Sequence, residues 1–279
     1  MEKYDLLPEQ LLYEGTLTEA NFFKPTALTD QQILLTHSSD YLSKLMNLTL
    51  SRKEERNIGF PVKSSLISRG RVISGGTYEC ALHALEQGVA MNIAGGTHHA
   101  FADRGEGFCI LNDMAIASNL LLHQNLVQKV LFIDLDVHQG NGNAALFHGD
   151  ERVFTFSMHG AKNYPLRKEQ SDWDVGLPDG MEDKPYLSLL ANALPRLMDT
   201  VAPDIIFYQA GVDILSTDKL GRLSITTAGC RERDKMVLKT ALQNSVPIVI
   251  SMGGGYSIRI ADIIESHANT FRTAQEIYF

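Results

Sequence analysis

Five short runs of almost uninterrupted apolar residues constrain this chain more than any other feature. They fall at residues 89–96, 129–138, 152–159, 203–213 and 247–256. Strands that are apolar nearly throughout are buried on both faces, as in a parallel sheet covered by helices. Amphipathic stretches separate them at 113–124, 183–201 and 226–245, the first with Asn112 as its N-cap. The sequence therefore predicts an α/β fold, a mainly parallel sheet with helices on both faces.

The domain organisation follows from the absence of any internal division. No repeat, low-complexity tract or linker interrupts the 279 residues, so we expect one domain over 1–279. The first 70 residues are more polar and less regular. They predict peripheral helices and loops, with Thr29–Leu50 as the best helix.

Charge limits the class of partner. The chain has 25 Lys and Arg against 33 Asp and Glu, a formal net charge of −8. Direct binding of nucleic acid requires a basic face, so this balance argues against it. An acidic rim around a binding site would instead attract cationic substrates such as lysine side chains or polyamines.

The cysteines and the N-terminal segment indicate the compartment. Cys80, Cys109 and Cys230 are widely separated and form no CxxC motif, which favours a reducing environment. The opening MEKYDLLPEQ lacks the basic and apolar regions of a signal peptide. No apolar stretch approaches the roughly 18 residues of a membrane span. We therefore expect a soluble, cytoplasmic protein.

Polar side chains with catalytic potential end the apolar runs. His98 and His99 follow the first, Asp136 and His138 end the second, Asp213 ends the fourth, and Tyr256 ends the last. Ligands of open parallel sheets bind beyond the carboxyl ends of the strands. The sequence thus predicts an active site at that edge of the sheet.

The segment DLDVHQGNG suggests a metal site. In an extended strand Asp136 and His138 point to one face and reach one ion, with Asp134 one step deeper on that face. Asp213 would complete a set of two carboxylates and one imidazole, leaving a position open as catalytic zinc requires. Fe²⁺ accepts the same ligands. Each part alone has an ordinary explanation, because a D-x-H pattern arises by chance and a terminal aspartate commonly caps a helix.

Other catalytic motifs are absent or incomplete. SMGGGYS does not meet the dinucleotide pattern G-x-G-x-x-G, and the chain has no G-x-S-x-G nucleophile elbow. Cys109 is a conceivable nucleophile, although a buried inert thiol is the commoner state of such a residue.

Taken together, five ordered motifs resemble the zinc-dependent histone deacetylase family, including its bacterial members. They are GGTHHAFADRGEGFCILND, FIDLDVHQGNG, FSMH, YQAGVDIL and SMGGGYS, and DVHQGNG looks most like the class IV branch. The resemblance implies an arginase/deacetylase-like fold. It also implies Asp136, His138 and Asp213 as zinc ligands and His99 as general base. His98 would pair with Asp134, and Tyr256 would support the oxyanion.

The resemblance further implies a substrate tunnel and a second cation. Phe108 and Tyr164 are similar to the aromatic walls of the acyl-lysine tunnel, with Gly107 and Gly254 along the passage and Leu220 at the rim. A monovalent cation, K⁺, would bind near the zinc through oxygens of the strand that carries Asp134, Asp136 and His138, and through oxygens of Ser157 and Met158. A second such site would involve Phe147 and Val153.

The chain departs from the family pattern at two places. Asn141 stands where class I members carry an aspartate, which should lower the working pKa of His99. The chain opens at a segment that a first strand usually precedes. The fold-sharing arginases need a further aspartate for their second manganese, and here that position is Gly140. This argues against a binuclear arginase.

We accordingly expect a zinc-dependent hydrolase that removes acetyl or longer fatty-acyl groups from lysine side chains of proteins or peptides. One alternative is deacylation of small molecules such as acetylpolyamines. Another is a non-catalytic protein that binds acyl-lysine. The sequence predicts no oligomeric state.

Overall fold

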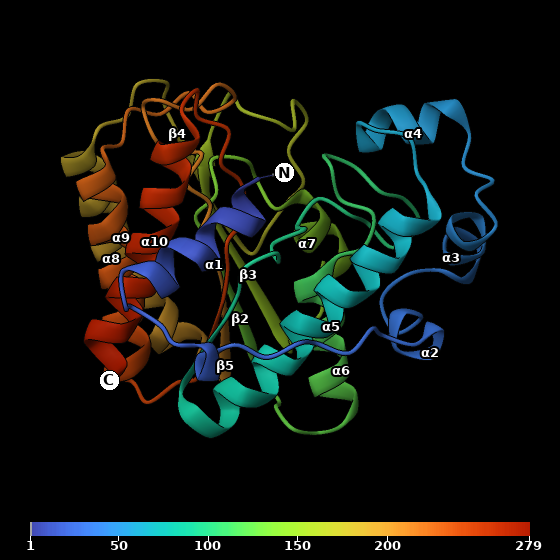
Figure 1. The fold of residues 1–279 in the computed structure, drawn as a ribbon, viewed down its shortest axis with the longest axis horizontal. Coiled ribbons are helices and arrows are strands. Elements are labelled where there is room, and N and C mark those ends of the chain that lie inside the picture. Colours follow the sequence, from blue (N-terminus) through green and yellow to red (C-terminus); the bar gives the residue numbers. More distant parts are fainter. Residues whose placement is uncertain (1) are drawn as a thin grey trace.

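The computed structural model describes residues 2–279, which form one α/β domain (Figure 1). All strand pairs in its six-stranded sheet are parallel, and the order is β1-β6-β5-β2-β3-β4. The strands are β1 (Val89–Asn92), β2 (Val130–Asp134), β3 (Val153–Gly160), β4 (Trp173–Leu177), β5 (Ile205–Gln209) and β6 (Ile248–Ser251). This confirms the predicted fold class.

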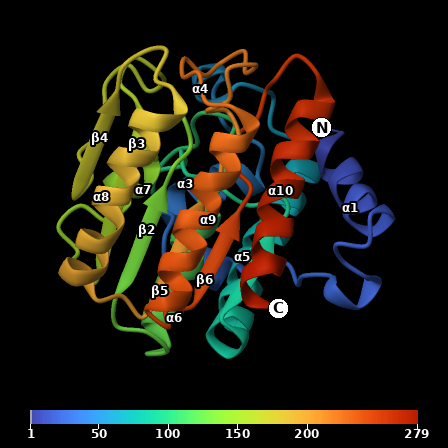
Figure 2. The same cartoon turned by 90° about the vertical axis from the view of Figure 1, so that its left-hand side faces the viewer.

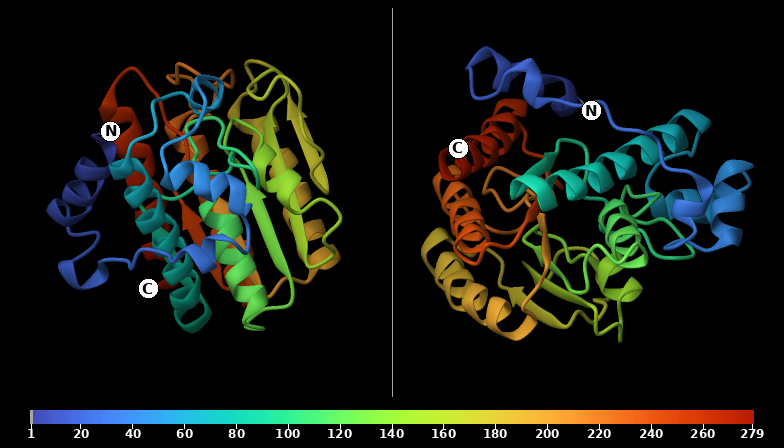
Figure 3. Two further views of the ribbon diagram at one scale, coloured as in Figure 1. Left: turned by 90° about the vertical axis from the view of Figure 1, so that its right-hand side faces the viewer. Right: turned by 90° about the horizontal axis from the view of Figure 1, so that it is seen from below.

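Helices cover both faces of the sheet. One face carries α8 (Asp183–Val201), α9 (Thr227–Gln243) and α10 (Ile260–Tyr278), as Figure 2 shows. The other carries α5 (Ser64–Gln87) and α6 (Asp113–His123), which lie in front of the strands in the left panel of Figure 3. The remaining helical segments are α1 (Lys3–Tyr13), η1 (Glu19–Asn21), α2 (Asp30–Ile33), α3 (Ser39–Met46), α4 (Arg52–Ile58) and α7 (Asn141–Leu146).

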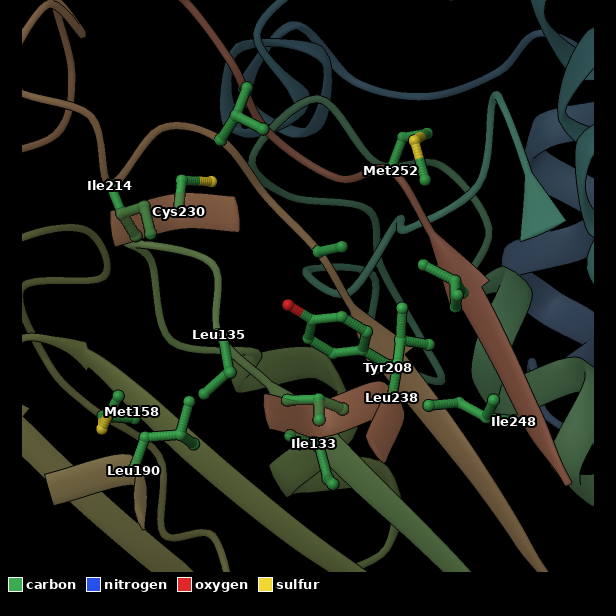
Figure 4. Packing of buried hydrophobic residues seen from close by; sticks show 14 of the residues in the cluster. Ile133, Leu135, Met158, Leu190, Tyr208, Ile214, Cys230, Leu238, Ile248 and Met252 are labelled. Carbon is green, nitrogen blue, oxygen red and sulfur yellow. The ribbon is translucent and has the colours of Figure 1, made fainter. Parts of the chain in front are cut away.

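Strand β2 shows why apolar runs become two-sided strands. Leu131 and Ile133 pack into the core under α8, α9 and α10, whereas Val130 and Phe132 pack into the core under α5 and α6. Successive side chains of a strand point to opposite faces, so both sets must be apolar. Figure 4 shows the first of these cores, with Ile133 among Leu190, Leu238 and Tyr208.

The strands end earlier than the apolar runs do. Strand β2 stops at Asp134, so Asp136 and His138 lie in the segment after the sheet ladder instead of in an extended strand. Side chains end the ladder, because the backbone N–H groups of Asp136 and His138 donate to the carboxylates two residues earlier, at 3.2 and 3.0 Å. Asp136 and His138 do lie close together, as predicted, but only the residues up to Asp134 belong to the strand.

The prediction of one helix over Thr29–Leu50 is wrong. This segment forms α2 and α3, separated at residues 34–38. A contact with a distant part of the chain stabilises this break. His37 is buried, and its Nε2 accepts the backbone N–H of Asn112 at 3.0 Å. Ser38 then caps α3 by accepting the N–H of Tyr41.

Two long helices and an edge strand were not predicted. Small residues dilute the apolar pattern of α5, and they are needed for packing, since a Cβ at Gly75 would overlap the Thr26 carbonyl. Helix α10 and strand β4 were also missed, the latter because it is an edge strand whose exposure alternates.

The N-terminal region is less peripheral than predicted. Helix α1 packs on α10, where Arg272 forms an ion pair with Glu14. This packing brings Lys3 to a buried position where its Nζ donates to the Gly253 carbonyl at 2.8 Å. No helix of residues 2–279 is long and apolar enough to cross a membrane. All three cysteines are buried thiols.

Candidate active site

The carboxyl ends of four strands deliver the predicted site residues to one place. His98 and His99 follow β1, Asp136 and His138 follow β2, Asp213 follows β5, and Tyr256 follows β6. Crossing hydrogen bonds fix these segments together. The Val137 N–H donates to Asp213 at 2.9 Å, and the Gly254 N–H donates to Asp136 at 2.9 Å.

Asp136, His138 and Asp213 form a buried cluster. Their ligand atoms lie within 4.8 Å of one another, and His138 Nδ1 is 3.1 Å from Asp136 Oδ1 and 3.2 Å from Asp213 Oδ2. Gly254 is required for this approach, because a Cβ there would overlap the Asp213 carboxylate. The structure therefore brings together the three residues predicted as ligands.

The electrostatics of the cluster fit a cation. Burial, with the charge of Asp136 beside it, raises the pKa of Asp213 to about 7. Burial alone would raise the pKa of Asp136 as well, but the charge of His98 and the contact with His138 hold it well below its usual range. Burial lowers the pKa of His138, but its contacts with Asp136 and Asp213 outweigh burial and raise that pKa to about 10. The cluster thus holds a proton where a divalent cation would take its place, and two carboxylates and one imidazole are donors that zinc accepts.

The two adjacent histidines differ in their partners. His98 Nδ1 lies 2.7 Å from Asp134 Oδ2, whereas His99 Nδ1 lies 2.6 Å from the amide oxygen of Asn141. Burial lowers the pKa of His98, but the Asp134 and Asp136 charges outweigh it and raise that pKa to about 9. Burial and the charge of His98 hold the pKa of His99 well below its usual value.

This difference leaves His99 as the neutral member of the pair. An amide oxygen can only accept, so His99 donates its Nδ1 proton to Asn141 and keeps a lone pair on Nε2. The two rings lie 4.1 Å apart between centroids, and two positive charges that close are disfavoured.

Tyr256 and Phe108 stand beside this pair. Burial, helped by the Asp213 and Asp136 charges, raises the pKa of Tyr256, so its phenol keeps the proton it can donate. Its ring centroid is 6.1 Å from that of Phe108. Phe108 follows Gly107 in a turn where both residues have positive φ, +53° and +69°. A Cβ at Gly107 would press on the His99 ring.

A cavity of about 790 Å³ gives access to these groups. Its outer wall includes Phe108, Tyr164 and Leu220, which are 45%, 39% and 45% exposed. Tyr164 meets the His99 ring edge-on at 5.1 Å, and its hydroxyl donates to Glu106 at 2.8 Å. The tunnel residues predicted from sequence thus line the cavity that contains the Asp136, His138 and Asp213 cluster.

The lining of this cavity is mostly basic, whereas the net charge of the chain suggested an acidic rim. Apart from Asp136 and Asp213, the lining contains no carboxylate, and its other charged side chains are Lys3, Arg56, Arg69, Lys162 and Arg222. None of these five residues was predicted, because they come from five separate segments and none of them belongs to a recognisable motif.

Sequence analysis also missed Asp113, which positions the histidine loop. Its carboxylate accepts the backbone N–H of Gly96 and Thr97 and the hydroxyl of Thr97, at 2.6 to 3.2 Å. The signal was present in the chain, as an aspartate directly after the N-cap Asn112 of α6.

Two further predictions concern neighbouring positions. Asp134 and Ser157 are register partners in β2 and β3, next to Met158, where the monovalent cation was predicted. Phe147 and Val153 are both buried in the core under α5 and α6. A cation at either place stays a prediction. At Gly140 a Cβ would overlap the Asp134 carboxylate, so the position has no room for a further ligand side chain.

Comparison with known proteins agrees with this geometry. The histone deacetylase domain family matches residues 1–271. An uncharacterized protein of Picosynechococcus sp. is 42% identical over all of this chain and 93% of its own length. Histone deacetylase 2 of Arabidopsis thaliana is 34% identical over 92% of this chain and 70% of its own.

Solved structures share the fold. The crystal structure of a histone deacetylase homologue in complex with SAHA superposes with a TM-score of 0.84 at 24% identity, covering 97% of this chain and 77% of that one. The homologue from Aquifex aeolicus gives 0.80, also at 24% identity, over 97% and 76%. With a family match across nearly the whole chain and relatives above 30% identity, this protein belongs to the histone deacetylase family.

Proposed function

We propose that this protein is a zinc-dependent hydrolase that removes acyl groups from lysine side chains of proteins or peptides. Membership of the histone deacetylase family supports hydrolase activity of the deacetylase or deacylase type. The observation that carries the proposal is the buried Asp136, His138 and Asp213 cluster next to the His98 and His99 pair, inside one cavity. A protein that only binds acyl-lysine has no need of both sets.

Asp136, His138 and Asp213 would hold the zinc. A zinc ion in such a site polarises a carbonyl and lowers the pKa of water, which is the chemistry that amide hydrolysis needs. The remaining work falls to the protein's own side chains.

His99 accepts the proton of the attacking water at Nε2, because its Nδ1 proton is engaged by Asn141. As the amide C–N bond breaks and a C–O bond forms, His99 returns that proton to the departing lysine amine. His98, held by Asp134, keeps a positive charge close by and favours negative charge on the substrate. The Tyr256 phenol donates to the substrate oxygen as it becomes negative. The products are a free lysine side chain and a carboxylic acid.

The proposal includes two further features. K⁺ would bind at Asp134, Ser157 and Met158, supported by the pairing of Asp134 with Ser157 across β2 and β3. A cytoplasmic location is supported by three buried cysteines that form no disulfide.

Metal content and turnover test the function together. We expect one zinc per chain by elemental analysis and hydrolysis of a fluorogenic acyl-lysine peptide that stops on chelation and returns with Zn²⁺. Asp213→Ala should lose the metal, whereas His99→Ala should keep it and lose turnover. Two metals per chain, or a zinc-loaded protein that binds the peptide without cleaving it, would contradict the proposal. Competition with acetylated polyamines tests the small-molecule alternative.

A further inference from the structure

The charge of the cavity lining runs against that of the chain as a whole. The protein has a net charge of −8, yet every charged side chain of the lining outside the metal cluster is a lysine or an arginine. A bound divalent ion would neutralise Asp136 and Asp213, leaving the cavity cationic.

Arg56 provides the first of these charges at the cavity mouth. It lies in α4, whose end is bonded to the turn beside His99. The Gly107 N–H donates to Asn57 at 3.1 Å and the Phe108 N–H donates to Ile58 at 2.7 Å. Arg56 is exposed, its Nε donates to the Arg52 carbonyl of its own helix, and within residues 2–279 it has no carboxylate partner.

Lys162 and Arg222 provide a second cationic group. Both pair with Asp179, at 3.6 and 3.4 Å, and their side chains are 72% and 56% exposed. The side-chain amide of Asn163 donates to the Leu220 carbonyl at 2.7 Å, which ties the two loops together at the rim. Asp179 carries one negative charge and the two side chains carry two positive charges, so one positive charge of this group remains uncompensated.

Two carboxylates that bond to lining residues, Glu106 and Asp218, are already engaged. Glu106 accepts from Arg104 and from the Tyr164 hydroxyl, both at 2.8 Å. Asp218 accepts the backbone N–H groups of Leu220, Gly221 and Tyr256, at 2.6 to 2.9 Å. Each of these carboxylates already accepts two or more hydrogen bonds from the protein.

We infer that the mouth selects acyl-lysine within an acidic peptide segment, with Asp or Glu flanking the modified lysine. This inference rests on the proposed function and names its substrate class. Lysine-rich segments and acetylated polyamines would bring positive charge against Arg56, Lys162 and Arg222, and like-charge juxtaposition disfavours them. Flanking carboxylates would form exposed ion pairs there, and two such pairs change affinity on the order of two- to thirtyfold.

The test uses matched acyl-lysine peptides that differ only in their flanking residues, Glu, Gln or Lys. Binding is measured by fluorescence anisotropy on zinc-loaded His99→Ala full-length protein, and kcat/KM on the zinc-loaded wild type. We expect both to fall in the order Glu, Gln, Lys, and the Glu-to-Lys ratio to shrink as salt screens the charges. Arg56→Gln/Arg222→Gln should bring that ratio close to one.

Lys129→Gln/Lys239→Gln is the matched control, because it removes the same charge from exposed positions at the opposite end of the sheet. It should keep the wild-type ratio. Equal binding of the three peptides, or tighter binding of the Lys peptide, overturns the inference, as does equal displacement by a short DNA strand. Acidic preference in binding without hydrolysis of any peptide would instead overturn the proposed function alone.

Discussion

At the scale of single residues, the adjacent histidines His98 and His99 have pKa values shifted in opposite directions, and a single hydrogen-bond partner distinguishes them. Asp134 presents a carboxylate oxygen to His98, and Asn141 presents an amide oxygen to His99. The carboxylate stabilises an imidazolium and the amide does not. His98 is therefore the charged member of the pair and His99 the neutral one.

This contrast predicts the effect of Asn141→Asp on the pH profile. A carboxylate beside His99 raises its pKa, and His99 works as a base only when neutral. Activity is lost as pH falls through that pKa, so the acid limb of kcat/KM should move to higher pH. The pH–rate profiles of the wild type and the variant measure this shift. An unchanged acid limb would mean that another group controls it.

Tyr256 allows a test of oxyanion support. Tyr256→Phe keeps the ring that contacts Phe108 but removes the donor. We expect kcat to fall by about 10²–10³, with zinc content unchanged because the phenol is not part of the ligand cluster. A kcat equal to that of the wild type would remove Tyr256 from the mechanism.

At the scale of elements, a buried arginine joins α9 to the segments that follow the two central strands, β2 and β5. Arg233 is fully buried, pairs with Asp234 at 2.8 Å, and donates to the carbonyls of Leu135 and Gly211 at 3.3 and 2.6 Å. Leu135 is the residue directly before Asp136, and Gly211 lies two residues before Asp213. Asp234 in turn accepts from Thr270 of α10 at 2.8 Å.

Removing one partner of this pair leaves an unpaired buried charge. Arg233→Ala should therefore lower the free energy of unfolding by about 3–5 kcal/mol, as measured by urea denaturation. Lys235→Ala, an exposed position on the same helix, should change it by less than about 0.5 kcal/mol. Equal stability of the two variants would show that Asp234 finds another partner.

At the scale of the whole molecule, the lining of the cavity is not confined to the loops that carry the histidines and the cluster. Residues of α1 and α5 also line it, among them Lys3, Ile73 and the buried Ser74. The Ser74 hydroxyl is buried and has no hydrogen-bond partner among residues 2–279, and burial lowers the pKa of Lys3 to about 8. Space beyond the reacting carbonyl is what an acyl group longer than acetyl needs.

This space predicts that kcat/KM rises from acetyl-lysine to octanoyl-lysine, since each buried CH₂ contributes about 0.8 kcal/mol. Peptides differing only in acyl length measure the ratio. Ser74→Leu fills the inner cavity and should lower the octanoyl-to-acetyl ratio. Cleavage of acetyl as fast as octanoyl would mean that the inner space does not hold the acyl chain.

The sequence by itself determined the fold class and two of the three cluster residues, Asp136 and His138, and both for a local reason. Apolar runs report two-sided burial within a few residues, and DLDVH places Asp136 two residues from His138 whatever surrounds them. Ordered motifs then indicated Asp213, His99 and Tyr256. The single helix over Thr29–Leu50 failed because His37 is held by Asn112, a residue far along the chain that no local pattern includes.

Only the tertiary structure decided the character of the cavity. Lys3 contacts Gly253, which is 250 positions away in the sequence. Arg56 of α4 and two loop residues, Lys162 and Arg222, line the same cavity. Composition averages charge over the whole surface, so a net charge of −8 said nothing about a cationic lining. Electrostatic recognition depends on which charges lie within a few ångströms of a ligand, and folding alone sets those distances.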